Sequence, residues 1–170
     1  MRVTAGRQCL GLDGRWRFLR DPDDIGIAEG WERQGLPHPA DTLAVPGVWN
    51  RAFPLYTGVA WYETSFEVPS AVPTGPAWLR VGAANQLAEF WLNGLPLGGH
   101  EGGYTPFALR CEQALRRDGP NRLVARLVDP PAEGEAGGLK LGETACAKES
   151  WYYRYGGIWG SVALEWGGPA

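Results

Sequence analysis

The densest run of aromatic and polar side chains lies near the end of the chain, directly after a stretch rich in glycine and glutamate. Its members are Trp151, Tyr152, Tyr153, Arg154, Tyr155 and Trp159. Aromatic faces stack on the C–H faces of sugars, and neighbouring polar groups satisfy sugar hydroxyls. These residue types predict a carbohydrate-contacting surface at residues 151–155. The alternative is that alternate members pack inward, which would leave about half of the rings exposed.

Four acidic residues near the loops are the candidates for hydrolytic chemistry. They are Glu101, Asp129, Glu143 and Glu149. Retaining hydrolysis of a glycoside needs two carboxyl groups about 5 Å apart, one as acid/base and one as nucleophile. An isolated loop carboxylate is far more often a solvated charge than a catalytic group. We therefore expect no catalytic residue in this chain.

Histidine and cysteine form no metal-binding pattern. His100 stands beside a glutamate, but the only other histidine is His38, so we expect a hydrogen-bonded structural role for His100. Cys9, Cys111 and Cys146 are odd in number and lack a Cys-x-x-Cys spacing, which argues against a disulfide framework or a structural zinc. The sequence predicts no metal and no cofactor.

Charge and hydropathy exclude several classes of partner. The formal net charge is -3, and no block of five or six Lys or Arg occurs, so nucleic acid is not an expected partner. The apolar runs are far shorter than the ~18 residues that span a bilayer, so no membrane partner is expected. The first residues lack the apolar core of a secretion signal. We expect a cytoplasmic protein, or a secreted one if a signal peptide has been removed.

Alternation of apolar and polar residues predicts an all-β protein. The 170 residues suit one domain, and 25 glycines with 14 prolines suit short strands joined by turns. Expected strands cover residues 15–19, 42–45, 61–68, 78–81, 87–92, 122–128 and 162–166. Asn93-Gly94 predicts a tight hairpin. No alternation of strands with helices indicates a parallel sheet.

The connecting segments carry further expectations. Residues 21–41 read as a loop with a short helical turn near 27–31, and residues 111–117 are compatible with one helical turn. Residues 129–149 are rich in Pro, Gly and Glu, which predicts a long loop of functional interest. The glycine pair Gly102-Gly103 indicates a tight bend that turns Tyr104 and Phe107 back onto the sheet, and the pair Gly156-Gly157 indicates a close approach to a neighbouring segment.

Four stretches, met in order, resemble the N-terminal sugar-binding domain of family 2 glycoside hydrolases of the β-galactosidase, β-glucuronidase and β-mannosidase type. They are Leu12-Asp13-Gly14-Arg15-Trp16-Arg17-Phe18; Val45-Pro46-Gly47-Val48-Trp49 with Gly58-Val59-Ala60-Trp61-Tyr62; Trp91-Leu92-Asn93-Gly94 with His100-Glu101-Gly102-Gly103-Tyr104-Thr105-Pro106-Phe107; and Ser150-Trp151-Tyr152 with Gly157-Ile158-Trp159-Gly160-Ser161-Val162. Four motifs in register over nearly the whole chain indicate the domain type and leave the sugar open.

The resemblance implies a two-sheet antiparallel jelly-roll β-sandwich of the galactose-binding type, with residues 1–170 as a single domain and a long loop at 129–149. In the family, loops of this domain reach over the mouth of a catalytic barrel that carries both catalytic glutamates. The resemblance therefore implies sugar contacts for Trp49 and Asn50 as well as for residues 151–155. Some relatives carry an acidic residue where this sequence has Trp151, which replaces a carboxylate by a stacking face.

The sequence thus predicts a non-catalytic domain that contacts a carbohydrate of the β-glycoside class. A catalytic barrel domain or subunit is the expected protein partner. Two alternatives remain open. The chain is a fragment or subunit of an active β-glycosidase whose barrel lies elsewhere, or it is a protein-interaction sandwich that binds no sugar and presents a flat aromatic patch.

Overall fold

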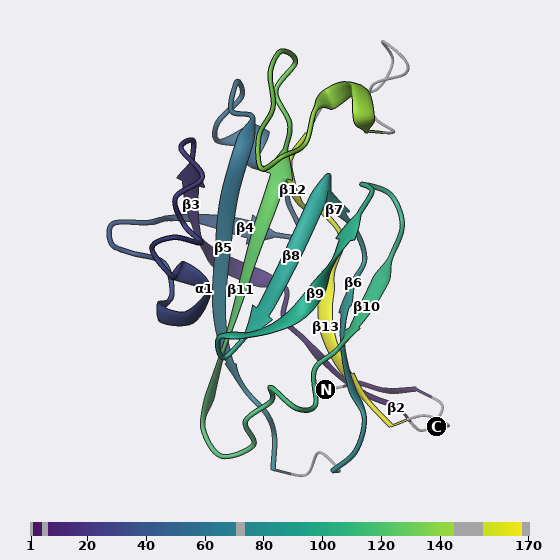
Figure 1. The fold of residues 1–170 in the computed structure, drawn as a ribbon. Helices are drawn as coiled ribbons and strands as arrows, with labels where there is room; N and C mark the ends of the chain where they lie inside the picture. The colour runs from purple at the N-terminus through teal and green to yellow at the C-terminus, as the bar shows by residue number, and fades with distance from the viewer. Residues whose placement is uncertain (1, 5–6, 71–73, 145–154, 168–170) are drawn as a thin grey trace.

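The computed structural model describes residues 2–4, 7–70, 74–144 and 155–167. Two antiparallel sheets pack face to face as a β-sandwich, and Figure 1 shows their long strands running nearly upright. A short pairing of β7 (Ala84–Asn85) with β12 (Gly157–Ile158) lies towards the upper end in that view. The predicted all-β sandwich is therefore confirmed.

The two main sheets differ in size. The five-stranded sheet has the order β1 (Arg2–Thr4), β2 (Arg7–Gly11), β13 (Val162–Trp166), β6 (Ala77–Val81), β10 (Phe107–Arg110). The six-stranded sheet has the order β4 (Asp41–Val45), β3 (Gly14–Asp21), β5 (Gly58–Glu67), β11 (Pro120–Asp129), β8 (Leu87–Leu92), β9 (Leu95–Glu101). Among the described residues, the helical segments are α1 (Trp31–Gln34) and two single 3-10 turns, η1 (Trp49–Arg51) and η2 (Leu141–Glu143).

The main core lies between the two sheets, where alternate residues of each strand point inward. Trp16 and Phe18 on β3 and Tyr62 on β5 are almost fully buried, and they meet Leu79 of β6 and Leu164 of β13 from the other sheet. Full burial of each such side chain contributes roughly 1.5–3 kcal/mol. This alternation fixes which face of each strand is left for other contacts.

A second cluster covers the outer face of the six-stranded sheet. Trp61 on β5 packs edge-on against Trp31 of α1 and stacks on Trp91 of β8, with ring centroids 5.7 Å apart in both pairs. Asp21, itself buried, accepts a hydrogen bond from Trp61 Nε1 at 2.9 Å and also from the backbone N–H of Gly26 at 2.9 Å. These bonds hold the loop before α1 against the sheet.

Two ion pairs of Arg126 stabilise the same outer face nearer its upper end. Arg126 of β11 donates through Nη2 to the two carboxylate oxygens of Asp24, at 2.7 and 2.8 Å, and through Nε to Asp24 Oδ1 at 3.1 Å. Its Nη1 donates to Glu89 of β8 at 2.7 Å. Burial alone would lower the pKa of Arg126, but the two carboxylates outweigh burial and raise that pKa. The guanidinium thus links the loop after β3 to β8.

The alternation correctly predicted the longer strands. Residues 162–166 form β13 as expected, and the Asn93-Gly94 hairpin joins β8 to β9 with both residues at positive φ, 54° and 83°. The strand predicted at 61–68 begins earlier and ends one residue sooner, as β5. The alternation of apolar and polar residues therefore predicted the strands correctly wherever one face of the strand is buried.

Several elements differ from the sequence-based expectation. The helical turn expected near 27–31 is found slightly later, as α1. Residues 111–117 contain no helix, because the Asn121 side chain binds both the N–H and the C=O of Arg116, each at 2.8 Å, and so takes the place of helical bonds. The predicted hairpin at Asn93-Gly94 implied a strand after it, but the bounds of β9 were not predicted, since its sequence LPLGGHE has little strand propensity and pairs as an edge. Strands β1, β2, β7, β10 and β12 were missed.

Within the described part of the chain, no helix has both the length and the apolar character needed to cross a bilayer.

Candidate functional site

Two backbone segments, residues 47–50 and 156–158, cross at the upper end of the sandwich in Figure 1. The N–H of Trp49 donates to the Gly156 carbonyl at 2.9 Å, and the N–H of Gly156 donates to Asn50 Oδ1 at 2.8 Å. The N–H of Gly47 donates to the Ile158 carbonyl at 2.8 Å. The segment that follows residue 154 is therefore held against residues 47–50 by three hydrogen bonds.

This crossing requires glycine. A Cβ added to Gly156 would lie 1.9 Å from Cζ2 of the buried Trp49, far inside contact distance. A Cβ on Gly103 would lie 2.2 Å from Asn85 Oδ1. The close approach expected for the Gly156-Gly157 pair is thus confirmed, and the neighbour is the Trp49 ring.

Three aromatic rings gather on this crossing. Trp159 meets Tyr155 at a centroid distance of 5.6 Å and Tyr104 at 5.9 Å, and the two tyrosines lie 6.1 Å apart. All three pairs are edge-to-face, a favourable geometry for aromatic rings. We call Tyr104, Tyr155 and Trp159 the aromatic triad.

Hydrogen bonds to the backbone orient the triad. Trp159 Nε1 donates to the Gly103 carbonyl at 2.8 Å, which anchors the indole to the bend before Tyr104. The Asn85 side-chain amide donates to the Tyr155 carbonyl. Tyr104 is 48% exposed, whereas Tyr155 and Trp159 are half-buried. The triad therefore offers one solvent-facing ring supported from behind by two others.

The structure places the predicted sugar-contacting residues unequally. Tyr155 belongs to the triad, and Asn50 is half-buried at the crossing, where its Nδ2 also donates to the Tyr56 carbonyl at 3.3 Å. Trp49 is 0% exposed and packs against Phe18 and Tyr62, so its ring belongs to the core and cannot serve as a stacking face. Sugar contact for Trp49 was an implication of the family resemblance, which covered Trp49 together with Asn50.

Trp151, Tyr152, Tyr153 and Arg154 lie outside the described residues.

One triad member was not among the predicted site residues. Tyr104 follows the Gly102-Gly103 bend, which we expected to turn Tyr104 and Phe107 back onto the sheet. Phe107 does pack on Phe90, at a centroid distance of 5.9 Å, but Tyr104 points outward onto the triad. The glycine pair was the sequence signal that could have identified Tyr104. An aromatic residue directly after such a pair is oriented by the backbone bend and does not follow the in-and-out alternation of a strand.

The loop beside the crossing carries a partly apolar surface. Leu55 is 96% exposed, and the Arg20 guanidinium lies 4.2 Å from the Phe53 ring centroid. The Tyr56 hydroxyl accepts the Asp21 N–H at 3.1 Å and donates to the Val59 carbonyl. Burial raises the pKa of Tyr56 to about 12, so the phenol stays a neutral tether for this loop.

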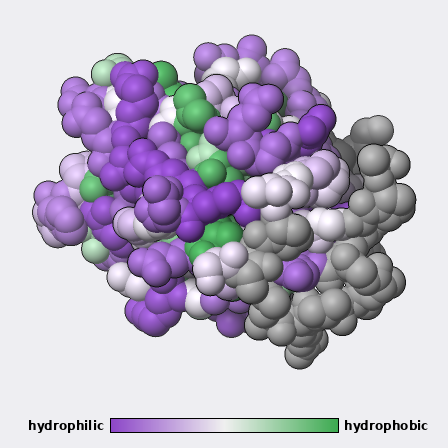
Figure 2. Space-filling model, turned by 90° about the horizontal axis from the view of Figure 1, so that it is seen from below, coloured by the Kyte–Doolittle hydropathy of each residue, from purple (hydrophilic) through white to green (hydrophobic). Residues whose placement is uncertain are grey.

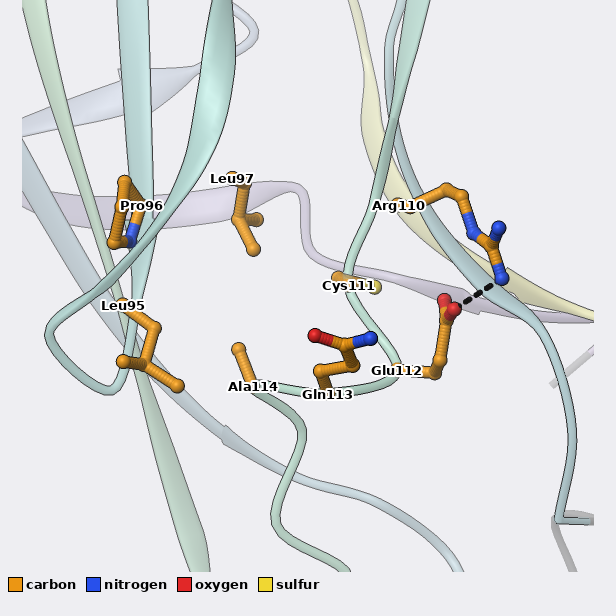
Figure 3. A pocket seen from close by; sticks show the side chains of 8 residues that line it. All are labelled: Leu95, Pro96, Leu97, Arg110, Cys111, Glu112, Gln113 and Ala114. Atoms are coloured by element: carbon orange, nitrogen blue, oxygen red, sulfur yellow. Dashed lines mark hydrogen bonds and ion pairs between the residues drawn. The ribbon is translucent and has the colours of Figure 1, made fainter.

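A different pocket opens near the lower ends of β9 and β10 (Figure 3). It is about 350 Å³ in volume, and its walls are Leu95, Pro96, Leu97, Arg110, Cys111, Glu112, Gln113 and Ala114. Arg110 and Glu112 pair with each other across its rim, which leaves little charge for a ligand. Burial raises the pKa of the Cys111 thiol to about 12, so this thiol is a poor nucleophile. With no aromatic wall, this pocket lacks a sugar-stacking face.

The acidic residues considered for hydrolysis differ in their exposure. Glu101 and Glu143 are exposed, and Glu143 accepts a hydrogen bond from the Lys140 N–H at 3.2 Å. Asp129 is buried at the end of β11, and Glu149 lies outside the described residues. Across the described ranges, no group of three His, Cys, Asp or Glu side chains converges as a metal site would require.

His100 contacts its own loop and a neighbouring ring. Its Nε2 lies 2.9 Å from Thr105 Oγ1, and its ring stacks on Phe107 with centroids 4.4 Å apart. These contacts provide the structural hydrogen bond expected of this residue.

Comparison with known families gives one match over nearly the whole chain. Residues 10–166 match the family described as glycosyl hydrolases family 2, sugar binding domain. The β-glucuronidase of Paenibacillus borealis is 36% identical over 111 residues, and the β-glucuronidase of Homo sapiens is 33% identical over 117 residues. Each alignment covers 61% of this chain but only 18% of the relative.

Solved structures give the same match in three dimensions. The crystal structure of Ruminococcus gnavus β-glucuronidase superposes with a TM-score of 0.80 at 25% identity, over 96% of this chain and 30% of that chain. The complex of that enzyme with D-glucuronic acid is equally similar, with a TM-score of 0.80. The chain thus corresponds to one part of much longer proteins.

Proposed function

The chain belongs to the sugar-binding domain family of the family 2 glycosyl hydrolases, and on that premise we propose that its upper end forms one wall of a carbohydrate pocket. The observation that carries the proposal is the aromatic triad, set on a glycine-dependent backbone crossing. A fixed ring that faces solvent is what the C–H face of a sugar requires, because a rigid partner loses little entropy on binding.

The chain itself supplies contact and orientation in this proposal. Hydrolysis would need a close pair of carboxyl groups, which this proposed function does not assign to the chain. The catalytic pair would come from a barrel domain or subunit of the family 2 type. On this chain, the residues proposed to contact the sugar are the triad, residues 151–154 and Asn50.

We assign the contact with the barrel to the apolar loop beside the crossing, which carries Phe53 and Leu55. Leu55 is almost fully exposed at the same end as the triad, since Asn50 of the preceding turn binds Gly156. Burial of such a leucine against a partner contributes about 2 kcal/mol. A loop placed there would bring the triad to the edge of the barrel mouth.

The sugar we propose to test first is a β-glucuronide, because the curated and structural relatives described above are β-glucuronidases. Galactose and mannose remain alternatives within the same family. The tryptophan at position 151, where some relatives carry an acid, is a reason to test neutral sugars alongside.

The test is a titration of the chain with glucuronic acid, galactose and mannose, followed by amide chemical shifts and tryptophan fluorescence. We expect shifts at Tyr104, Tyr155 and Trp159 and a millimolar dissociation constant, since one or two rings supply only about 1 kcal/mol each beyond burial. Tyr104→Ala should abolish the shifts, while Tyr104→Phe keeps the ring and should retain them. Shifts confined to other parts of the chain, or unaffected by Tyr104→Ala, would refute the site.

A second function, protein interaction without sugar, is favoured by the exposed Leu55 alone. In that case, Leu55→Ala would weaken a protein complex while none of the three sugars shifts the triad amides. Turnover of nitrophenyl glycosides by the purified chain, lost on Glu101→Gln, would instead support catalysis by the chain itself.

A further inference from the structure

A cleft rich in arginine lies on the outer face of the six-stranded sheet, far from the aromatic triad. It is about 430 Å³ in volume, within the range of small-ligand sites. The lining residues that carry its chemistry are Arg33, Glu63, Ser65, Asn93, Arg116 and Arg122. We call it the arginine cleft. Arg122 and Asp129 stand near opposite ends of β11, so the cleft and the upper end are roughly 23 Å apart at ~3.3 Å per residue.

Strand register explains why these groups converge. Arg122 of β11 pairs directly with Ser65 of β5, and Val124 pairs with Glu63. Arg122, Ser65 and Glu63 thus stand on the outer face, while the residues between them point into the core. The lower loop adds Arg116, and α1 adds Arg33 from above the sheet.

The only carboxylate lining the cleft is already neutralised. Glu63 accepts a hydrogen bond from Arg17 Nη1 at 2.6 Å and another from the Leu36 N–H at 2.6 Å. Arg33 pairs with Glu32 at 2.8 Å. The cleft therefore keeps an excess of positive charge that comes from the remaining two arginines.

Those two arginines lack an acidic partner among the described residues. Arg122 donates one Nη2 hydrogen bond to the Arg33 carbonyl, and its buried Nε has no hydrogen-bond partner in the described structure. The Arg116 guanidinium is exposed and forms no ion pair with a described side chain. The Ser65 hydroxyl beside them already donates to the Asn121 carbonyl at 3.1 Å. The two underused guanidinium groups themselves form a favourable setting for an oxyanion, because the planar fork of arginine matches carboxylate and phosphate oxygens.

The end of the molecule that carries the turn at 93–94 and the loop at 111–119 is seen in Figure 2. Strongly hydrophilic residues surround a narrow apolar strip on that face. A charged ligand can therefore approach the lower part of the molecule over a polar surface.

We propose that the arginine cleft is a second ligand site of this chain, which binds an oxyanion: the carboxylate of an acidic sugar or inorganic phosphate. This site is separate from the carbohydrate wall at the upper end and does not depend on it. In the acidic-sugar case, the chain would hold an anionic saccharide at a distance from the reacting bond.

The test is an amide chemical-shift titration of the chain with sodium glucuronate, sodium phosphate and uncharged glucose, at fixed ionic strength. We expect either anion to shift the amides of Ser65, Asn93, Arg116 and Arg122, and glucose to leave them unmoved. Tighter binding of glucuronate than of phosphate assigns the site to acidic sugars, and the reverse order assigns it to phosphate.

Charge-removing variants give the decisive readout. Arg122→Gln and Arg116→Gln should each weaken anion binding about tenfold, because a hydrogen bond to a charged group is worth about 1.5 kcal/mol or more. Arg80→Gln, which removes the same charge from β6 on the other sheet, should leave the affinity unchanged. Arg116 is exposed, so its variant keeps the test valid if Arg122→Gln unfolds.

Three results would overturn the proposal: no shift with either anion, equal shifts with glucose, or unchanged affinity in both cleft variants. Shifts at the triad amides report only on the upper end, so failure of one site is distinguishable from failure of the other.

Discussion

The two ends of the sandwich are built in opposite ways. At the upper end, backbone segments cross so closely that glycine is required at 103 and 156, and the rings lie on top of that crossing. At the lower end, side chains do the work, since the amides of Asn93 and Asn121 hold a loop and the arginines face a cleft. The upper end thus presents a fixed shape, whereas the lower end presents charge.

This difference teaches where each kind of recognition is encoded. Shape at the upper end depends on residues that have no side chain, because the rings of Tyr104 and Tyr155 are placed by the neighbouring Gly103 and Gly156. Charge at the lower end depends on the arginines themselves, because their guanidinium groups would meet the ligand. Substitutions at the two ends should therefore differ in how much stability they remove.

The largest effect is expected for Trp49→Ala at the upper end. The ring is fully buried between Phe18, Tyr56 and Tyr62, and its loss would leave a cavity beneath the crossing. Truncation of a buried tryptophan typically lowers the free energy of unfolding by about 3–5 kcal/mol. Urea denaturation followed by circular dichroism measures this loss.

The matched control for Trp49→Ala is Trp78→Ala, on the half-buried outer side of β6. We expect it to cost about 1–2 kcal/mol, because less area leaves water there. Equal losses for the two variants would contradict a core role for Trp49.

A smaller loss is expected for Asn121→Ala at the lower end. Its Oδ1 accepts hydrogen bonds from Asn93 Nδ2 at 2.9 Å and from the Arg116 N–H at 2.8 Å, and the residue is 0% exposed. Loss of these bonds should lower the free energy of unfolding by about 2 kcal/mol. The same urea experiment measures it, with the exposed Gln113→Ala as a control that should change little. A loss as small as that of the control would show that the amide network does not hold the loop.

Alkaline pH should weaken both ends, in sequence. Burial raises the pKa of Cys111 at the lower end from 9.0 to about 12, and burial raises that of Tyr56 at the upper end from 10.0 to about 12. A raised pKa means that the folded state favours the neutral form. The resulting stability is present below the unfolded-state pKa and is lost as the pH rises towards 12.

The measurement is the urea midpoint between pH 7 and pH 11. We expect it to begin to fall above pH 9 and to fall more steeply above pH 10. Cys111→Ala should delay the first decline, and Tyr56→Phe should reduce the second, while burial of Tyr62 adds to the same trend. A midpoint that is constant up to pH 11 would show that neither group loses stability on ionisation.

Sequence reasoning succeeded where a periodic signal exists and failed where geometry overrides it. The alternation in β3 and β5 is forced by a buried inner face, so residues 15–19 and 61–68 were read correctly. Trp49 was misassigned to the sugar surface because the residues around it in the sequence do not show that its ring is buried. The glycine that packs against this ring is distant in the chain. The Trp49 N–H donates to the Gly156 carbonyl, although more than a hundred residues separate the two in the sequence.

The arginine cleft was invisible for the same reason. Arg33, Arg116 and Arg122 come from a helix, a loop and a strand that share no sequence motif. Only the register of β11 on β5 and the position of α1 bring them together. Tyr104 is intermediate, since its glycine bend can be recognised in the sequence but its contacts with Tyr155 and Trp159 cannot.

The smallest effect on stability is expected for Tyr104→Ala, and this variant most sharply separates fold from function. The ring is 48% exposed and packs edge-to-face against the other two triad members. Loss of such contacts should cost about 1 kcal/mol or less, because exposed positions carry little burial energy. Tyr104→Phe keeps the ring and should unfold at the wild-type urea concentration. If the triad exists to bind sugar, the alanine variant loses binding while it keeps nearly all of its stability. If the free energy of unfolding of the alanine variant falls by several kcal/mol, Tyr104 supports the backbone crossing. A structural role would then account for the solvent-facing ring without a sugar ligand.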